Sequence, residues 1–228
     1  MITEVEDFYD FESKFYDNLY SSFIDDLIFI KKYGFEPPYC ELFSGTGRIS
    51  RFLENSCGLE INKKMVLGAS TRYNAVIGDA RMIPFKKHFK TVLIPLNSLN
   101  LLDRNSRIEV LRESNRILLD NGKIYLEIMN GFPFEIGNEF LVSEFSDHRN
   151  NVSVFITPIS EGGRLYFKYR YIINGETVTK KLMIFPISSK EIEEEAKLAN
   201  LKILHIFGGF NFEEFNAKSD RMIIVMTK

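Results

Sequence analysis

A short apolar run followed by two glycines constrains this 228-residue chain more than any other feature. The run covers residues 39–43, Gly45 and Gly47 follow it, and an apolar periodic segment begins at Ile49. This order predicts a strand, a tight turn and a helix over residues 46–55. Glycine suits the turn because a side chain there would block the backbone path or a ligand lying on it. The N–H groups at the start of the helix would face such a ligand.

The turn belongs to the segment Glu41-Leu-Phe-Ser-Gly-Thr-Gly47, in which an acid, three residues and a Gly-x-Gly pair follow one another. This segment resembles the first motif of the class I S-adenosylmethionine (SAM)-dependent methyltransferases. Many members of that family have a further glycine where this chain has Phe43. The resemblance implies that Glu41, Gly45, Thr46 and Gly47 contact SAM, and that Glu41 helps to orient its methionine end.

A second acid, Glu60, lies near the end of the next short apolar run, residues 57–61. In Rossmann-like sheets an acid at this place accepts hydrogen bonds from the ribose hydroxyls of a nucleoside. Residues 60–65 also resemble the family's acid-x-Ser-x-x-Met pattern, with Asn62 in place of the serine and equally able to cap the following helix. Glu60 and Ile61 are therefore predicted to contact the cofactor.

The third predicted strand, residues 73–77, is followed by Gly78-Asp79-Ala80. This triplet resembles the family's third motif. The resemblance implies that the Asp79 carboxylate accepts a hydrogen bond from the adenine amino group, while the Ala80 N–H donates to the adenine ring. A carboxylate acceptor beside an amide donor selects adenine.

The fourth predicted strand, residues 91–96, is apolar and leads into Asn97 and Ser98. Ligands of doubly wound sheets lie outside the carboxyl ends of the strands, so we expect both side chains in the site. Asn97 is predicted to contact the cofactor and the acceptor. The segment resembles the family's fourth motif in its small-molecule form. It has neither the Pro-Pro-aromatic signature of enzymes that methylate amino groups of nucleic-acid bases nor the Pro-Cys nucleophile used on cytosine.

The remaining segments fit the same family pattern. Apolar spacing and capping residues predict helices over 8–33, 103–119 and 188–200, and strands over 124–129, 201–207 and 222–227. An insertion at 131–187 is predicted to contain three antiparallel segments, 151–158, 164–174 and 177–187. An Asn-Gly pair between the last two is a strong hairpin signal.

The resemblance covers the whole chain and implies an α/β fold of the Rossmann-like class I methyltransferase type. We expect a mostly parallel seven-stranded sheet with helices on both faces and a small antiparallel β insertion after the fifth strand. Residues 1–228 are expected to form one domain. Within it, residues 1–37 would form a helical cover and residues 131–187 would lie over the acceptor site.

Composition narrows the class of protein further. A net charge of −2 and a pI of about 6.0 give no general attraction to nucleic acid or anionic membranes. The chain has no apolar run long enough to span a membrane, and its acidic start lacks the basic residues of a signal peptide. Cys40 and Cys57 are too few for a disulfide scaffold and lack metal-ligand neighbours. We therefore expect a cytoplasmic protein that binds no metal, no nucleic acid and no membrane. The exposed hairpins in residues 151–187 could pair between two subunits of a homodimer.

These motifs together predict a SAM-dependent methyltransferase that acts on a small-molecule acceptor and releases S-adenosyl-L-homocysteine. A weaker resemblance links the chain to N-methyltransferases of glycine/sarcosine and of amino sugars. Because the methyl group of a sulfonium is already activated, the protein mainly has to place the acceptor. The chain offers no His-Asp pair at the end of a strand, which favours an amine acceptor over a hydroxyl. Tyr16, Asn97 and His148 are the predicted residues on the acceptor side.

Two alternatives stay open at this stage. An NAD-dependent oxidoreductase would share the strand, the turn and the ribose acid. However, the third glycine of its GxGxxG motif would fall at Ser50, and no Tyr-x-x-x-Lys set is evident. A non-catalytic SAM-binding partner subunit would share every motif described above.

Overall fold

A seven-stranded sheet forms the centre of the computed structural model, which describes residues 2–20, 22–68 and 73–228. Its strand order is β10-β11-β5-β4-β1-β2-β3, and the five strands from β1 to β5 run parallel. The strands are β1 (Tyr39–Leu42), β2 (Ser56–Glu60), β3 (Asn74–Ile77), β4 (Phe89–Ile94), β5 (Leu118–Met129), β10 (Lys202–Phe207) and β11 (Arg221–Thr227). The mostly parallel seven-stranded sheet is thus confirmed.

Strand β11 separates this sheet from the dinucleotide-binding type. It lies between β5 and β10 and runs antiparallel to both. A Rossmann dinucleotide fold has a sixth parallel strand directly beside the fifth. The topology therefore argues against the NAD-dependent alternative.

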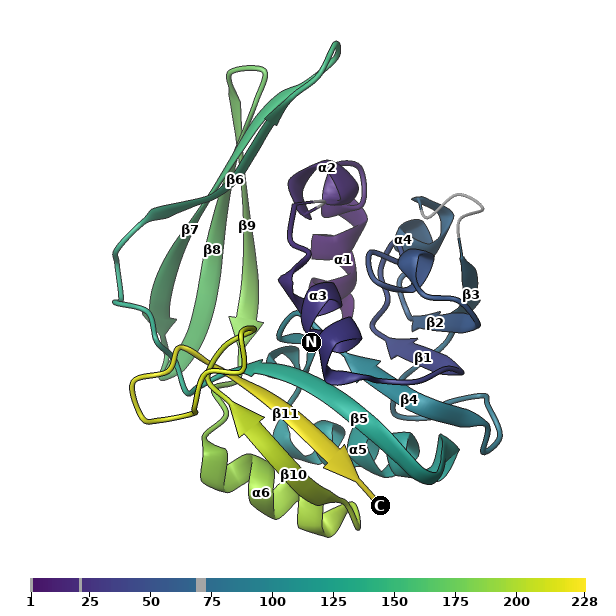
Figure 1. Ribbon diagram of the computed structural model, residues 1–228. Coiled ribbons are helices and arrows are strands. Elements are labelled where there is room, and N and C mark those ends of the chain that lie inside the picture. The colour runs from purple at the N-terminus through teal and green to yellow at the C-terminus, as the bar shows by residue number, and fades with distance from the viewer. Residues whose placement is uncertain (1, 21, 69–72) are drawn as a thin grey trace.

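Helices cover both faces of the sheet, as the sequence predicted (Figure 1). α5 (Arg104–Ile117) and α6 (Ser189–Leu198) pack on the face to which Val92, Ile124 and Ile224 point. α3 (Asp25–Tyr33) packs on the opposite face, against the alternate residues Leu93, Tyr125, Ile223 and Val225. Successive strand residues point to opposite sides, so both layers are apolar.

Capping side chains fix the ends of these helices. The Asp103 carboxylate accepts a hydrogen bond from Ser106 N–H at 2.9 Å and begins α5. Ser188 and Glu191 form a reciprocal capping box at the start of α6, as predicted. No helix within the described ranges is long and apolar enough to cross a membrane.

Two helix predictions are wrong in detail. The helix expected over 8–33 is three pieces, α1 (Ile2–Glu12), α2 (Tyr16–Tyr20) and α3. The helix expected over 46–55 is a turn followed by the short 3-10 helix η1 (Ser50–Phe52). Gly47 has a positive φ of 78°, which an α-helix does not accommodate, and the Glu41 carboxylate binds Ser50 N–H instead.

A second sheet follows β5 and stands beside the N-terminal helices (Figure 1). It is antiparallel, with the order β6-β7-β8-β9, and so confirms the predicted insertion. Its strands are β6 (Phe140–Ser146), β7 (Asn151–Glu161), β8 (Arg164–Ile173) and β9 (Glu176–Ile184). The sequence prediction contained only the last three. A separate apolar core joins this sheet to α1 and α2 through Phe8, Leu19 and Tyr171.

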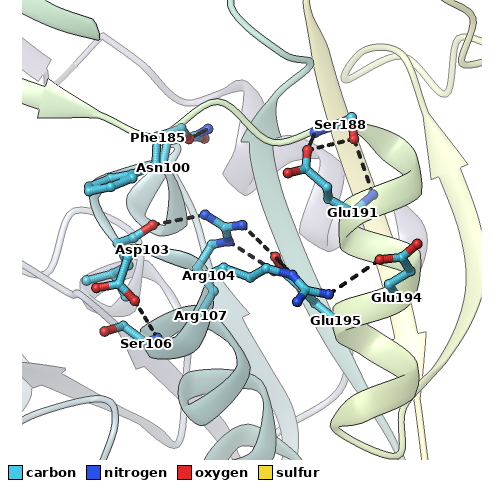
Figure 2. A network of polar contacts seen from close by, with 11 residues as sticks. Asn100, Asp103, Arg104, Ser106, Arg107, Phe185, Ser188, Glu191, Glu194 and Glu195 are labelled. Carbon is cyan, nitrogen blue, oxygen red and sulfur yellow. Dashed lines mark hydrogen bonds and ion pairs between the residues drawn. The ribbon is translucent and has the colours of Figure 1, made fainter. Parts of the chain in front are cut away.

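Polar side chains link α5 to α6 and the loop after β4 to the segment before α6 (Figure 2). Arg107 is buried, and its guanidinium forms an ion pair with the buried Glu195. Asn100, in the 3-10 helix η2 (Ser98–Leu101), donates to Phe185 O at 3.0 Å and accepts from Met129 N–H at 3.1 Å. These bonds fix the loop after β4 relative to the point where the chain enters and leaves the inserted sheet.

Candidate active site

Two adjoining cavities lie at the carboxyl ends of the parallel strands. The first, of about 330 Å³, is lined by the residues that follow β1, β2, β3 and β4. The second, of about 490 Å³, lies between the N-terminal helices and the inserted sheet. Tyr9, Tyr16, Leu96 and Leu101 line both cavities and so form the wall between them.

Glu41 lies at the base of the first cavity. Its Oε2 accepts hydrogen bonds from the N–H and the hydroxyl of Ser50. Burial raises the pKa of the Glu41 carboxyl to about 7, although Ser50 and the nearby Arg48 oppose the shift. Arg48 itself is paired with Asp26 of α3. The turn after β1 is therefore anchored to the sheet and to α3 through buried charges.

The two motif glycines have different roles in the structure. Gly45 has a φ of 55° and lines the first cavity. Gly47 has a φ of 78° and does not line it; a Cβ there would lie 2.3 Å from the ring of Tyr73. A Cβ on Gly58 would meet the same ring at 2.4 Å, so the ring is clamped between two glycines. The structure thus ties Gly47 to the packing of Tyr73, and the contact of Gly47 with the cofactor stays a prediction.

Phe43 and Thr46 lie in the same turn after β1. Thr46 does not line either cavity, and its hydroxyl donates to Asp17 of α2. Phe43 lines the first cavity with a φ of 56°, a left-handed conformation that glycine adopts without strain. Many family members have glycine at this position, and the backbone here shows why glycine is favourable.

Glu60 connects the first two loops of the site. Its Oε2 accepts from Gly45 N–H at 2.9 Å and its Oε1 accepts from Asn62 N–H at 2.8 Å. Burial raises the pKa of the carboxyl, while these backbone bonds counteract the rise. Glu60 and Ile61 line the first cavity. Asn62 caps α4 (Lys63–Gly68) by accepting from Met65 N–H at 3.0 Å, as predicted.

Asp79 and Ala80 line the same cavity, where the sequence placed them. The Asp79 carboxylate is bound by Arg81, whose Nε lies 3.0 Å from both carboxylate oxygens. This guanidinium lowers the pKa of Asp79. The role of Arg81 was missed, although a basic residue two positions after the acid was the signal that could have indicated it.

Asn97 lines the second cavity and not the first, and its contact with the cofactor stays a prediction. It and Leu96 both have positive φ angles, 58° and 53°. The buried Glu127 of β5 holds this turn by accepting from Leu96 N–H at 2.9 Å. In the described part of the chain, no donor reaches the buried Asn97 Oδ1.

Of the other two predicted acceptor-side residues, Tyr16 lines both cavities, and burial raises the pKa of its phenol. His148 lies in the turn between β6 and β7, exposed to solvent, and lines neither cavity. The strands of the inserted sheet continue past α2, so their turns project beyond the site (Figure 1). The expectation that His148 reaches the acceptor is corrected accordingly.

Sequence reasoning missed the acidic residue of the second cavity, Glu12. It ends α1, is 2% exposed, and accepts hydrogen bonds from Tyr20 and Tyr171. Its position four residues after Phe8, on the apolar stripe of the helix, was a signal that this acid is buried. Within residues 2–20, 22–68 and 73–228, no cluster of His, Cys, Asp or Glu could hold a metal ion.

Comparisons with known proteins agree with this geometry. Residues 41–126 match the family model described as a methyltransferase domain. An uncharacterized protein of Methanocaldococcus jannaschii is 25% identical over 90% of this chain and 78% of its own length.

Among solved structures, the CcbJ methyltransferase of Streptomyces caelestis superposes with a TM-score of 0.73 at 18% identity, covering 89% of this chain and 88% of its own. CalS10 of Micromonospora echinaspora, a SAM-bound amino pentose methyltransferase of calicheamicin biosynthesis, has a TM-score of 0.69 at 15% identity, covering 91% and 90%. Residues 41–126 therefore match a methyltransferase domain, the chain has the class I SAM-dependent methyltransferase fold, and the resemblance noted from its motifs is confirmed.

Proposed function

We propose that this protein transfers the methyl group of SAM to a small-molecule amine. The observation that supports this most directly is the pair of cavities that meet at the wall formed by Tyr9 and Tyr16. A donor in the first cavity and an acceptor in the second would meet where these residues border both cavities. Holding two reactants in line is the main contribution an enzyme makes to methyl transfer from a sulfonium.

The residues of the first cavity fit SAM. Asp79 and Ala80 offer the acceptor and the donor that adenine needs, and Glu60 offers a carboxylate for the ribose. Gly45 and Glu41 lie at the end where the methionine part would be held. When bound, SAM supplies a methyl group on a positively charged sulfur that leaves as a neutral thioether.

The second cavity supports an amine acceptor. No histidine is among the described residues that line it, so this lining lacks the usual base for activating a hydroxyl. Tyrosine and phenylalanine rings form much of its wall, and aromatic faces attract the cation that develops on an attacking nitrogen. The similarity in fold to CalS10, an amino pentose methyltransferase, points to the same class of acceptor.

Calorimetric titration with SAM, S-adenosyl-L-homocysteine and NAD tests the first half of this proposal. We expect binding of the first two and none of NAD. Mass spectrometry of an amine mixture incubated with the protein and isotope-labelled SAM tests the second half. N-methylated products support the proposal, O-methylated products contradict the amine assignment, and SAM binding without any product indicates a non-catalytic SAM-binding subunit.

A further inference from the structure

Glu12 is the buried charge of the second cavity for which the fold itself gives no counter-ion. Its carboxyl lies among the rings of Tyr9, Tyr20 and Tyr169 and is 2% exposed. Among the residues that the structure describes, no Lys, Arg or His pairs with it. A buried carboxylate is normally paired, since the loss of hydration is costly. A positively charged group of a ligand would therefore supply the counter-ion that Glu12 lacks.

The hydrogen bonds of Glu12 are all on one oxygen. Tyr20 donates to Oε1 at 3.0 Å and Tyr171 donates to the same oxygen at 2.8 Å. No described residue donates to Oε2, and this atom is not among the fully enclosed atoms without a partner. Because Glu12 lines the second cavity, Oε2 keeps its capacity to accept a hydrogen bond from a bound molecule.

No other charged residue on the described lining of this cavity is paired with Glu12. Arg221 and Asp220 are the remaining charged residues on its described lining, and Arg221 is paired with Glu127 at 3.0 Å. The tyrosines around Glu12 have raised pKa values because they are buried, so they stay neutral in ordinary buffers. Only a carboxyl with two phenol donors thus faces the apolar, aromatic part of the cavity.

We propose that the acceptor is a compact amine with an apolar body, and that Glu12 binds its ammonium group and removes the proton before methyl transfer. This inference rests on the proposed function and adds to it a substrate class and a catalytic residue. Tyr20 and Tyr171 are positioning residues, since they hold Oε1 and leave Oε2 toward the ligand. The surrounding rings stabilise the ammonium ion by cation–π contact.

The proposed reaction balances without a further reagent. One N–H proton of the ammonium ion moves to Oε2, which leaves a neutral amine with a lone pair and a neutral Glu12. The lone pair forms a bond to the methyl carbon while the bond from that carbon to sulfur breaks and its electron pair stays on sulfur. The product is a methylated ammonium ion, and the proton on Glu12 returns to solvent.

The same geometry argues against other acceptors. An anionic acceptor would meet an unpaired carboxylate in a cavity of low dielectric constant and be repelled. Burial raises the pKa of Glu12 to about 7, against the lowering effect of Tyr171 and Tyr20, which makes it a base for an ammonium ion. It remains far too weak to deprotonate an alcohol.

A binding experiment on the full chain separates these classes. The probes are isopropylamine, cyclohexylamine and benzylamine, each with its matching alcohol, titrated calorimetrically at pH 8 in the presence of S-adenosyl-L-homocysteine. We expect at least one amine to bind the natural protein at least tenfold more tightly than its alcohol. Glu12→Gln keeps the shape and the acceptor for Tyr20 and Tyr171, and it should abolish that preference, a loss of roughly 10- to 100-fold.

Two further variants keep the test decisive. Glu144→Gln removes an exposed carboxylate of the same inserted sheet and should leave the amine preference unchanged. Tyr171→Phe keeps Glu12 but removes one of its two donors, and should weaken the preference partially. The inference is overturned by the absence of any amine preference in the natural protein, or by an equal preference in Glu12→Gln.

The rate of methyl transfer supplies an independent readout. With an amine that binds, Glu12→Gln should lower kcat/KM by about 10²- to 10⁴-fold, as expected for loss of a general base. It should also remove the rise of kcat/KM with pH through about 7, because Glu12 must be deprotonated to act. An unchanged pH profile in Glu12→Gln would overturn the proton-transfer role.

Failure of this inference is distinguishable from failure of the proposed function. SAM affinity is measured separately, and Glu12 does not line the first cavity, so Glu12→Gln should bind SAM like the natural protein. If SAM itself does not bind, the proposed function fails. If SAM binds and methyl is transferred, but without amine preference or dependence on Glu12, only this inference fails.

Discussion

The first and second cavities differ in how the chain builds them. The first is made mostly of short segments that each follow a parallel strand, so most of its residues lie within a few positions of β1, β2, β3 or β4, and α1 and α2 complete it with a few side chains such as Tyr9 and Tyr16. The second is made of segments far apart in sequence, from Phe8 on α1 to Arg221 on β11, with the inserted sheet between them. One cavity is thus a product of local backbone geometry and the other of tertiary packing.

This difference predicts whether a substitution in each cavity changes stability, cofactor binding or both. In the first cavity a single residue often serves both the backbone and the site, as Glu60 does when it binds two backbone N–H groups. In the second cavity, most side chains project from α1 and from regular strands whose backbone bonds do not depend on them, and Asn100 is an exception. We expect substitutions in the first cavity to affect stability and cofactor binding together, and those in the second to affect them separately.

The largest expected effect is on the turn of the first cavity. Gly47→Ala places a Cβ 2.3 Å from a Tyr73 ring that Gly58 prevents from moving away, and it does so at a φ of 78°. Overpacking and left-handed strain together should lower the free energy of unfolding by about 2–5 kcal/mol. Denaturant titration measures this value.

Gly34→Ala is the matched control, because Gly34 has a φ of 80° but no atom within 4 Å of the added Cβ. It should lower stability by only about 1–2 kcal/mol, which is the strain alone. Equal losses in the two variants would show that the clamp on Tyr73 has no energetic role.

A smaller effect is expected from the buried acid of the second cavity, and it depends on pH. The pKa of Glu12 rises from 4.5 to about 7 on folding, chiefly through burial, so the folded state holds a proton that the unfolded state has lost within that window. Stability therefore falls as pH rises from about 4.5 to about 7. Relative to Glu12→Gln, the natural protein should lose on the order of 3 kcal/mol across this window.

Thermal or denaturant unfolding of both proteins at a series of pH values gives this difference directly. The similarly shifted Glu41 is present in both proteins and cancels. A stability difference that does not vary with pH would contradict the burial of an ionisable Glu12.

Cofactor affinity is the next effect in size. Glu60→Ala removes the proposed acceptor of the ribose hydroxyls and should weaken SAM binding by about 1.5–3 kcal/mol, measured by calorimetry. Binding of an amine to the second cavity should change little, because Glu60 does not line it. SAM affinity equal to that of the natural protein would remove Glu60 from the cofactor site. Glu54→Ala, at an exposed carboxylate, serves as the control.

The smallest effect concerns the ion pair between Arg81 and Asp79 of the first cavity. Arg81 and Asp79 are each 31% exposed at their side chains, so Arg81→Ala should lower stability by less than about 1 kcal/mol. The pair lowers the pKa of Asp79, so its contribution is present at neutral pH and is lost as pH falls through that lowered pKa. A loss that persists in acid would show that Arg81 acts by packing and not by charge.

The same contrast explains what the sequence could predict. Glu41, Glu60 and Asp79 were located correctly in the first cavity because a strand end and the next few residues fix one another. The helix after Gly47 was predicted wrongly because helical periodicity says nothing of the Glu41 carboxylate that binds Ser50. Local pattern therefore predicts this cavity except where a buried side chain replaces a helical hydrogen bond.

For the second cavity, the sequence predicted which segments of the chain surround it but not its buried acidic residue. The N-terminal segment and the insertion were expected to enclose the acceptor site, but Glu12 was not singled out and β6 was not predicted. The Glu12 carboxyl of this cavity is held by Tyr171, which lies 159 positions from Glu12 in the chain. No local pattern links two residues at that separation, so Asn97 and His148 were assigned by strand ends and residue type alone.

Side chains alternate in direction along β7, β8 and β9, and this affects how the lining of the second cavity can change in evolution. The residues of these strands that line the second cavity alternate along β8 and β9, and cross-strand partners such as Ile156 with Tyr169 and Phe167 with Leu182 lie side by side. The ladder is made by the main chain, so one of these side chains can be exchanged while the strands keep their register. A lineage can thus acquire new acceptors by single substitutions here, while the turn after β1 is inherited unchanged.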